Sequence, residues 1–575
     1  MGLRPEAGQL KIAVGVVAPE GVGNDAQMSA FSVVCYTLGM TSVRRLAGLA
    51  AVGAAGLALT RSSASPEPPK HAAALAAVAP RNHEGTAEAE RGLEPALGVR
   101  GAPAEGVDLA DAREPVYTSA ILRSRAHAQE RILGRDQGTE DAWGHTVPAR
   151  RVALDEGQVP PPVNGNALGS FVPVENEPSL AHFQAALAAL STHPEQKNKV
   201  RIAAYGASHT QADIYTSYLR YYLQERFGNG GPGFMPLGME RGWSQHDFPV
   251  RSHNFHVEYV TSKGPPPHGR FGLSGSAAVS KPNAWVRVEP RDGRDPDLAA
   301  SQYRLYYAAE PEGAEISVSV DGEPAQSLPT RADSVEARSS LFERPLGWHS
   351  VEVRSLGNAP SRLFGLSIER MQPGLVIDTL GIRGTRAATL LLWDPALWEE
   401  PLRQRDPDLV ILAYGTNETT DGNQPIEEYA SSLEQVLARV RQILPQASCL
   451  LVGPGDFPKA QGDGWVTRPR LLEIIAEQRR QAPRFGCGFW DAYRFMGGAG
   501  SMAEWARSSP RLGASDHIHL TPRGYVRMGM SLGDALLRAY DAQRVPRDAR
   551  VTVQRAPEGA GSGVSAAAGA GSDSL

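Results

Sequence analysis

The sequence predicts an α/β fold with a second, all-β domain inserted into it. Near residue 200 and again after residue 371, short apolar runs alternate with segments whose apolar residues recur at helical spacing. Strands separated by helices imply a parallel sheet with helices on both faces, which makes three layers. Between about 245 and 370, apolar and polar residues alternate without helical segments. Because the first pattern stops and then resumes, the middle segment is predicted to be an insertion into the first crossover.

The α/β part begins with a strand at 200–205 and a helix. Apolar residues recur at helical spacing over 214–227, and Gly228 ends that segment. The strands of this part are short apolar runs, as expected for parallel strands buried on both faces. After the insertion we expect, in order, a strand at 375–380, an apolar segment at 387–393, a strand at 409–414, a helix at 425–444, a strand at 448–452, a helix at 468–481, a strand at 488–491 and a closing helix at 524–540, which Pro522 could begin.

The inserted segment, 245–370, is predicted to be an antiparallel β-sandwich or jelly roll. Apolar residues alternate with polar ones at 255–259, 316–320 and 351–353, and less regularly at 363–368. Its large aromatic residues should include core positions, and the sequence does not separate these from exposed ones. They are Trp285, Tyr303, Tyr306, Tyr307 and Trp348.

Residues 40–65 have the pattern of a secretory signal. Arg44 and Arg45 precede an apolar run at 46–59, and small residues follow up to Ser65. The run is too short for an ordinary membrane span. We therefore expect a mature protein that is exported, periplasmic or extracellular, with no membrane segment. Met40 would be a conventional start for such a signal, which makes 1–39 an atypical N-terminal extension.

Composition marks two further segments as disordered. The stretch 66–165 is rich in Ala, Glu, Pro, Gly and Arg, and the tail at 546–575 is rich in Gly, Ser and Ala. Neither can bury enough apolar area to offset its ordering entropy. The α/β domain is therefore assigned to 166–244 and 371–545, on either side of the insertion. The formal net charge of -5 gives no electrostatic reason to expect a nucleic-acid partner.

Cys449 and Cys487 fall in or beside predicted buried strands. A buried free cysteine behaves as a small apolar residue, whereas two cysteines in an oxidising compartment could pair. The sequence leaves both open. The cysteines do not have the spacing of a metal site.

Four short motifs, far apart in the chain, supply the groups that a serine esterase needs. They are GASHT around Ser208, IRGT around Gly384, YGTNE around Asn417 and DHIHLTPRGY around His519. Ser208 follows the first strand and precedes its helix, so its hydroxyl should lie at the carboxyl edge of the sheet, where open α/β sheets bind ligands. Unpaired N–H groups at the helix start, including that of Ser208, would stabilise a negative charge. Taken alone, the serine could simply cap the helix.

Gly384 and Asn417 follow the next two strands, so both should reach the same edge as Ser208. The tetrahedral intermediate of acyl transfer needs hydrogen-bond donors aimed at its oxygen. A glycine lets a backbone N–H approach closely, and an asparagine offers a side-chain N–H. With Ser208, they are the predicted oxyanion hole. Singly, each would be interpreted as a turn or loop residue.

Asp516 and His519 lie on the loop before the closing helix. A three-residue offset in a turn can place the carboxylate against one imidazole nitrogen, while the other nitrogen accepts the serine proton. His517, with the same two residues, could instead contribute to a metal site, but no other cluster supplies the remaining ligands. His209 is interpreted as a neighbour or substrate contact rather than the base. We therefore predict Ser208, His519 and Asp516 as the catalytic residues.

The four motifs resemble the successive blocks of the SGNH/GDSL hydrolases, whose name records the Ser, Gly, Asn and His matched by Ser208, Gly384, Asn417 and His519. The resemblance covers 195–245 and 371–542 and is nearest to bacterial peptidoglycan O-acetylesterases, through GASHTQADIYTSYLRYYLQERFGNGGPGF and FWDAYRFMGGAGSMAEW. It implies a flavodoxin-like three-layer α/β/α domain with an inserted carbohydrate-binding-module-like domain. One departure is Ala207, where the family usually has Asp; we expect a less ordered loop there rather than lost activity.

The resemblance implies a secreted esterase that removes O-acetyl groups from a cell-wall or extracellular polysaccharide, most of all peptidoglycan, through an acyl-enzyme on Ser208. It implies no metal and no cofactor, while the oligomeric state stays open, with a monomer favoured. Three alternatives stay open. The acyl-enzyme could pass its acetyl group to a sugar hydroxyl, as in an O-acetyltransferase. The chain could be a cell-wall-binding protein with a degenerate hydrolase module, or a lipase or thioesterase of the same family.

Overall fold

The computed structural model describes residues 115–134, 171–237, 247–260 and 269–551. All described residues belong to one compact unit of the chain. The predicted N-terminal extension and export signal, most of the linker and most of the tail lie outside the described residues. Within them, no helix has the length and apolar character needed to cross a membrane.

A five-stranded sheet forms the centre of the α/β part, and its neighbouring strands are all parallel, as predicted. The order is β11-β1-β12-β13-β16, so the first strand in sequence lies between the next two strands of this sheet. Most positions in these strands are buried. The strands are β1 (Lys199–Gly206), β11 (Gly374–Gly381), β12 (Leu409–Ala413), β13 (Ser448–Val452) and β16 (Cys487–Trp490).

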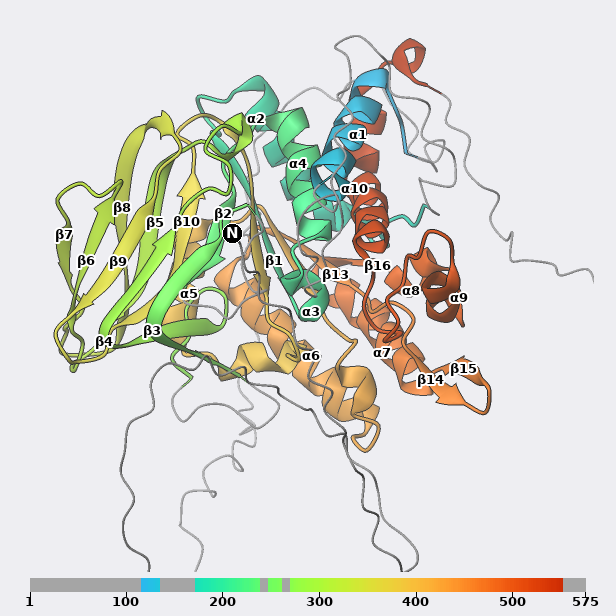
Figure 1. Ribbon diagram of the computed structural model, residues 1–575. Coiled ribbons are helices and arrows are strands. Elements are labelled where there is room, and N and C mark those ends of the chain that lie inside the picture. The colour runs from blue at the N-terminus through green and yellow to red at the C-terminus, as the bar shows by residue number, and fades with distance from the viewer. Residues whose placement is uncertain (1–114, 135–170, 238–246, 261–268, 552–575) are drawn as a thin grey trace, which may run out of the picture. The chain divides into compact units, whose positions relative to one another are not determined.

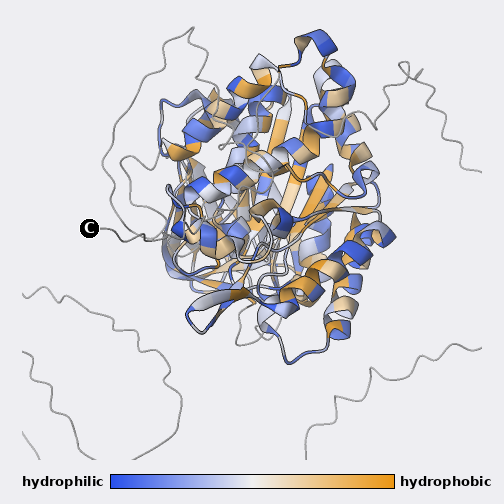
Figure 2. Ribbon diagram, turned by 90° about the vertical axis from the view of Figure 1, so that its right-hand side faces the viewer, coloured by the Kyte–Doolittle hydropathy of each residue, from blue (hydrophilic) through white to orange (hydrophobic). Residues whose placement is uncertain are grey.

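Helices pack on both faces of this sheet and form two apolar cores. Alternate residues of a strand belong to different cores: Ile202 and Ala204 to one, Ala203 and Tyr205 to the other. The strands are apolar between amphipathic helices (Figure 2). The first core includes α2 (Ala181–Thr192), α4 (Tyr215–Phe227), α8 (Ala492–Met496), α9 (Ser501–Arg507) and α10 (Pro522–Arg544); the second includes α5 (Pro395–Arg405), α6 (Ile426–Ile443) and α7 (Pro469–Gln481).

Several short elements complete the α/β part. The helix predicted at 214–227 is α4, and before it Ser208 begins a separate one-turn helix, α3 (Ser208–Gln211). The apolar segment predicted at 387–393 is mainly a 3-10 helix. The short elements are η3 (Glu177–Leu180), η5 (Ala387–Leu392), η6 (Glu418–Thr420), η7 (Ala482–Phe485), η8 (Arg547–Ala549) and the hairpin β14 (Pro458–Gln461) and β15 (Gly464–Thr467).

Helix α1 (Ser119–Leu133) corrects the prediction that all of 66–165 is disordered. Ile121, Ala128 and Ile132 are buried in the same core as α4 and α10, which α1 contacts. Its Arg125 is 1% exposed and pairs with Asp534 of α10. The average composition of 66–165 did not indicate this helix, because the residues that bury its apolar face are more than 80 positions away in sequence.

The insertion folds as a nine-stranded antiparallel sheet (Figure 1). Its main path runs β7-β6-β9-β4-β10-β5-β8, with β2 paired to β10 and β3 to β4. The antiparallel sheet begins earlier in the chain than the predicted boundary at 245, because β2 precedes that boundary and its backbone pairs with β10 at the end of the insertion. The strands are β2 (Gly233–Pro236), β3 (Val250–Tyr259), β4 (Ser276–Val288), β5 (Ala300–Ala309), β6 (Glu315–Val320), β7 (Gln326–Pro329), β8 (Glu336–Gly347), β9 (Val351–Leu356) and β10 (Arg362–Glu369), and η4 (Pro296–Leu298) precedes β5.

The aromatic residues of the insertion divide into core and surface. Tyr303, Tyr306 and Tyr307 are at most 4% exposed, so they are core residues. Trp285 is half-buried and stacks with His253. Trp348 is 44% exposed, and its indole N–H donates a hydrogen bond to the Asp295 carbonyl. The sandwich and jelly-roll assignments stay predictions.

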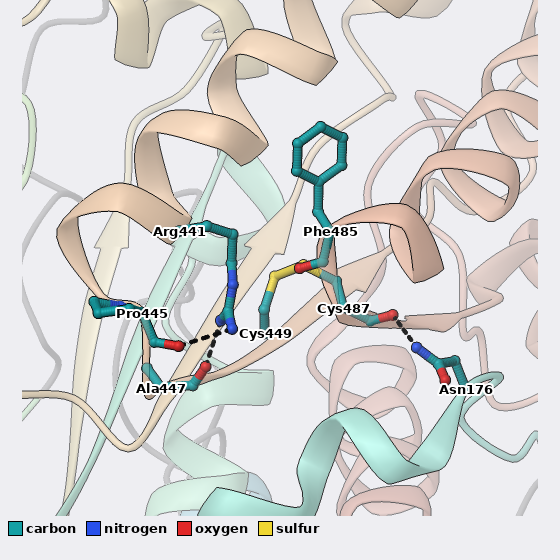
Figure 3. Close-up of a disulfide and its surroundings, with 7 residues drawn as sticks. All are labelled: Asn176, Arg441, Pro445, Ala447, Cys449, Phe485 and Cys487. Carbon is teal, nitrogen blue, oxygen red and sulfur yellow. Dashed lines mark hydrogen bonds between the residues drawn. A yellow bond between two sulfur atoms is a disulfide. The ribbon is translucent and has the colours of Figure 1, made fainter. Parts of the chain in front are cut away.

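Cys449 and Cys487 form a disulfide across the neighbouring parallel strands β13 and β16 (Figure 3). Both residues are at most 1% exposed. The Cys487 carbonyl accepts a hydrogen bond from Nδ2 of Asn176, the residue directly before η3. This bond connects the start of η3 to the sheet. The pairing that the sequence left open is therefore present in this structure.

Candidate functional site

Ser208 lies two residues after β1, at the carboxyl edge of the parallel sheet. The turn is tight at Gly206, where an added Cβ would lie 2.0 Å from Thr210 Oγ1 and 2.9 Å from the Ala413 carbonyl oxygen. A glycine is therefore needed where the strand turns into α3. Ala207 is 5% exposed, and its carbonyl accepts the Gln211 N–H at 2.9 Å.

Ser208, His519 and Asp516 form one hydrogen-bonded series. His519 Nε2 is 2.8 Å from Ser208 Oγ, and His519 Nδ1 is 2.6 Å from Asp516 Oδ2. With Nδ1–H donating to the carboxylate, Nε2 carries the lone pair that can accept the serine proton. The structure thus brings together the three residues predicted to be catalytic, although Ser208 lies more than 300 positions before the other two.

The Asp516 carboxylate is held in the turn by the backbone as well. Its Oδ1 accepts the N–H groups of Ile518 at 2.9 Å and His519 at 3.0 Å. Partial burial raises the pKa of Asp516, but the hydrogen bonds from the His519 side chain and from these two N–H groups outweigh it, and the pKa lies below its ordinary value. The group that orients His519 is therefore a carboxylate at neutral pH.

Gly384 and Asn417 follow the two strands that flank β1. Gly206, at the end of β1, is in register with Gly381 of β11 and Ala413 of β12, so the chain leaves all three strands at the same edge. Gly384 has φ +74° and open space where a Cβ would lie, so the backbone angle rather than crowding favours glycine. Asn417 Nδ2 donates to the Thr385 carbonyl at 2.8 Å. That amide nitrogen has a second hydrogen for another acceptor.

Glu418 joins the loops that carry these two residues, and the sequence reasoning missed it. Its carboxylate accepts the Ala387 N–H at 2.9 Å and the Gly415 N–H at 3.0 Å. Glu418 is 5% exposed, and burial raises its pKa. Arg386 and Asp421 form an ion pair between the same loops. The sequence does show a carboxylate directly after Asn417, but its burial depends on two loops more than 25 residues apart.

His209 packs beside the series without joining it. Its ring centroid is 5.3 Å from that of His519, and its Nδ1 is 3.1 Å from the Tyr525 hydroxyl. Burial, with a smaller effect of His519, lowers the pKa of His209 to about 3. It is therefore neutral at physiological pH and has no hydrogen bond to Ser208 Oγ among those of the described residues, so the structure favours its interpretation as a neighbour.

His517 contacts an aromatic side chain: its ring stacks on Trp465 with 3.8 Å between centroids. In the part of the chain that the structure describes, no three His, Cys, Asp or Glu side chains gather as a metal site would require. Ser208 instead has a base and an orienting acid within hydrogen-bond distance, which suits nucleophilic attack on an acyl carbon.

Residues 347–527 match the GDSL-like lipase/acylhydrolase family. This chain is an SGNH-type esterase. The matched segment of the esterase contains Gly384, Asn417, Asp516 and His519, whereas Ser208 precedes it on the other side of the insertion. No curated protein matches the sequence.

Among solved structures, the esterase is similar to a peptidoglycan O-acetylesterase, with 26% sequence identity and a TM-score of 0.53. The similarity covers 63% of this chain and 96% of that chain. A family two carbohydrate esterase from Cellvibrio japonicus also matches, with 14% identity over 51% of this chain and 99% of that chain, at a TM-score of 0.21.

Proposed function

We propose that this esterase removes O-acetyl groups from an extracytoplasmic polysaccharide, peptidoglycan above all, through an acyl-enzyme on Ser208. The observation that carries the proposal is the Ser208–His519–Asp516 series at the edge of an α/β domain. The similarity to a peptidoglycan O-acetylesterase over nearly that protein's full length supports the choice of substrate.

In the proposed reaction, Ser208 Oγ attacks the acetyl carbonyl carbon while His519 Nε2 takes the hydroxyl proton. The tetrahedral intermediate collapses when the bond to the sugar oxygen breaks, and His519 gives its proton to that oxygen. Water then attacks the acetyl-serine carbonyl carbon while His519 Nε2 takes one of its protons. The bond from that carbon to Ser208 Oγ breaks, His519 returns the proton to Oγ, and acetate leaves. Asp516 stays ionised throughout and holds Nδ1–H of the imidazole.

The N–H of Ser208, the N–H of Gly384 and the second Nδ2 hydrogen of Asn417 are the proposed oxyanion donors. Glu418 supports them, because it holds the loops after β11 and β12 together through backbone N–H groups. Losing one oxyanion donor typically reduces turnover about 10²- to 10³-fold. Fixed backbone donors of this kind need little reorganisation as charge develops on the oxygen.

Export is part of the proposal. A buried disulfide between β13 and β16 suits an oxidising compartment, since cytosolic proteins of most organisms keep such thiols reduced. The predicted signal at 40–65 is consistent with that location. A polysaccharide substrate outside the cytoplasm would then be accessible to the enzyme.

Acetate release from O-acetylated peptidoglycan and from an aryl acetate tests the proposal. We expect wild-type protein to release acetate from both substrates and Ser208→Ala to lose at least about 10³-fold in kcat, because the nucleophile is gone. Activity that survives this substitution would exclude Ser208 as the nucleophile. Acetyl groups recovered on an added acceptor glycan, instead of as free acetate, would favour the transferase.

A further inference from the structure

An exposed tryptophan stands beside the catalytic loop and has no part in the proposed chemistry. Trp465 lies on β15 of the β14–β15 hairpin, which projects from the neighbouring helices (Figure 1). The side chain is 39% exposed. Large aromatic residues usually bury most of their area, and exposed ones gathered near a site often contact a ligand.

Trp465 is fixed against the loop that carries the predicted acid and base. Its ring stacks on His517 with 3.8 Å between centroids and an interplanar angle of 21°. His517 has φ +57°, an uncommon backbone angle for a residue other than glycine, and it follows Asp516 directly. The Cα atoms of His517 and His519 are at most about 7 Å apart, so Trp465 packs on the same short loop that carries His519.

The base of the hairpin is anchored by a buried carboxylate. Thr467 Oγ1 donates to Asp456 Oδ1 at 2.7 Å, and Asp456 Oδ2 accepts the Met502 N–H of α9 at 3.1 Å. Asp456 is 1% exposed, and burial raises its pKa. Two contacts therefore hold Trp465 in place: the hydrogen bonds of Asp456 at the base of the hairpin and the stacking of its own ring on His517.

We propose that Trp465, backed by His517, is a platform that binds a pyranose ring of the glycan next to the ester undergoing hydrolysis. This inference rests on the proposed function. One face of a pyranose presents C–H groups, which contact the electron-rich face of an indole, while its hydroxyl groups stay at the edge in water. One side of the Trp465 ring packs on His517, and its exposed area is available to the sugar.

Such a platform contributes to binding of the polymer and not to bond breaking. Trp465 therefore has a different kinetic signature from the residues around Ser208. Its loss should raise KM for a glycan ester, which has sugar rings next to the acetylated one, and should leave KM for an aryl acetate, which has no sugar ring, nearly unaffected.

The test compares Trp465→Ala, Trp465→Phe and a control, Val466→Ala, in the full-length protein. Val466 is the next residue of the same strand, is 44% exposed and points to the opposite face of the hairpin. For Trp465→Ala we expect a KM for O-acetylated peptidoglycan about tenfold higher, with kcat/KM for 4-nitrophenyl acetate within about twofold of wild type. Trp465→Phe should recover most of the affinity, and Val466→Ala should match wild type.

Three results would overturn the platform. Equal losses on both substrates would show that Trp465 only supports the catalytic loop. An unchanged KM for peptidoglycan in Trp465→Ala would show that no sugar contacts it, and the same loss in Val466→Ala would assign the effect to the hairpin as a whole. A wild-type enzyme that cleaves the aryl acetate and no glycan ester would overturn the proposed substrate and the platform together.

Discussion

Ser208, the proposed nucleophile of this esterase, is positioned by the backbone. Ala207 replaces the aspartate usual before the serine in the family it resembles, and the turn still closes through its carbonyl, which accepts the Gln211 N–H. Gly206 leaves room for Thr210 beneath the turn. A buried methyl group and a backbone hydrogen bond hold the turn without a carboxylate, and the lower order expected at Ala207 stays a prediction.

His209 provides a prediction at the same scale. Its pKa is lowered to about 3 in the folded protein, against an ordinary value of 6.5. Below 6.5 the unfolded chain therefore binds a proton that the folded chain does not, so the stability due to neutral His209 is complete above 6.5 and is lost as the pH falls from 6.5 to 3. At pH 5.5 the loss should be about 1 kcal/mol.

Urea unfolding at pH 7.5 and pH 5.5 measures the stability that protonation of His209 removes. We expect the free energy of unfolding to fall more for wild type than for His209→Gln, which has no proton to bind in this range. The difference between the two falls isolates His209 from the other histidines. Equal falls in the two proteins would contradict a buried neutral His209.

The two loops after β11 and β12 are the elements on which the proposed oxyanion hole depends. Glu418 receives one backbone N–H from each loop, and Arg386–Asp421 connects them a second time. Gly384 and Asn417 lie on these loops, one on each. A buried carboxylate and an ion pair therefore fix the relative position of Gly384 and Asn417.

We expect Glu418→Gln to lower kcat at least about tenfold with little change in KM, because an amide NH2 would face a backbone N–H and move one loop away from the oxyanion. Kinetics with 4-nitrophenyl acetate measure this. Glu428→Gln, at an exposed position on α6, is the control and should behave as wild type. A Glu418→Gln enzyme with unchanged kcat would show that the loops keep their places without this carboxylate.

The sequence was sufficient for elements whose signal is local. Five parallel strands, the helices α4, α6, α7 and α10, and the start of α10 at Pro522 follow from apolar runs, helical spacing and a helix-starting proline, whereas α5 was not predicted. Elements that depend on distant partners were missed. Helix α1 is stabilised by α4 and α10, β2 by pairing with β10, and the hairpin at Trp465 by Asp456 and His517.

The same distinction holds for the site. Ser208, Gly384, Asn417 and His519 could be selected because each follows a recognisable strand or precedes a recognisable helix. Glu418 and Trp465 could not be selected, because their roles depend on contacts with other loops. The Glu418 carboxylate accepts backbone N–H groups from two loops, and the Trp465 ring stacks on His517.

Across the whole described molecule, one buried ion cluster joins the antiparallel sheet to the α/β part. Arg405 of α5 donates to both oxygens of Asp378 on β11, at 2.7 and 2.8 Å, and pairs with Glu369 on β10. Arg201 of β1 binds Glu369 at 2.9 Å. Asp378 also accepts the Phe234 N–H of β2 at 2.8 Å. Strands of both sheets therefore meet at two carboxylates that are at most 6% exposed.

Removing the guanidinium should destabilise the fold more than removing an exposed one from the same helix. We expect Arg405→Ala to lower the free energy of unfolding by about 3–5 kcal/mol, because it leaves buried carboxylates without their partner. Arg403→Ala is the control: Arg403 is 45% exposed and pairs only with glutamates of α5, so its loss should be below about 1 kcal/mol. Similar losses in the two variants would contradict the role of the cluster.

The pH dependence gives the cluster a second signature. Burial alone would raise the pKa of Glu369, but Arg405 and Arg201 outweigh it and lower the pKa from 4.5 to about 2. The stability from ionised Glu369 is therefore complete above 4.5 and is lost as the pH falls from 4.5 to 2. Without Arg405 this pKa lies closer to 4.5, so Arg405→Ala, although less stable at pH 7, should lose less stability than wild type between pH 5 and pH 3 in urea unfolding. A parallel decline in both proteins would show that Arg405 does not hold this carboxylate ionised.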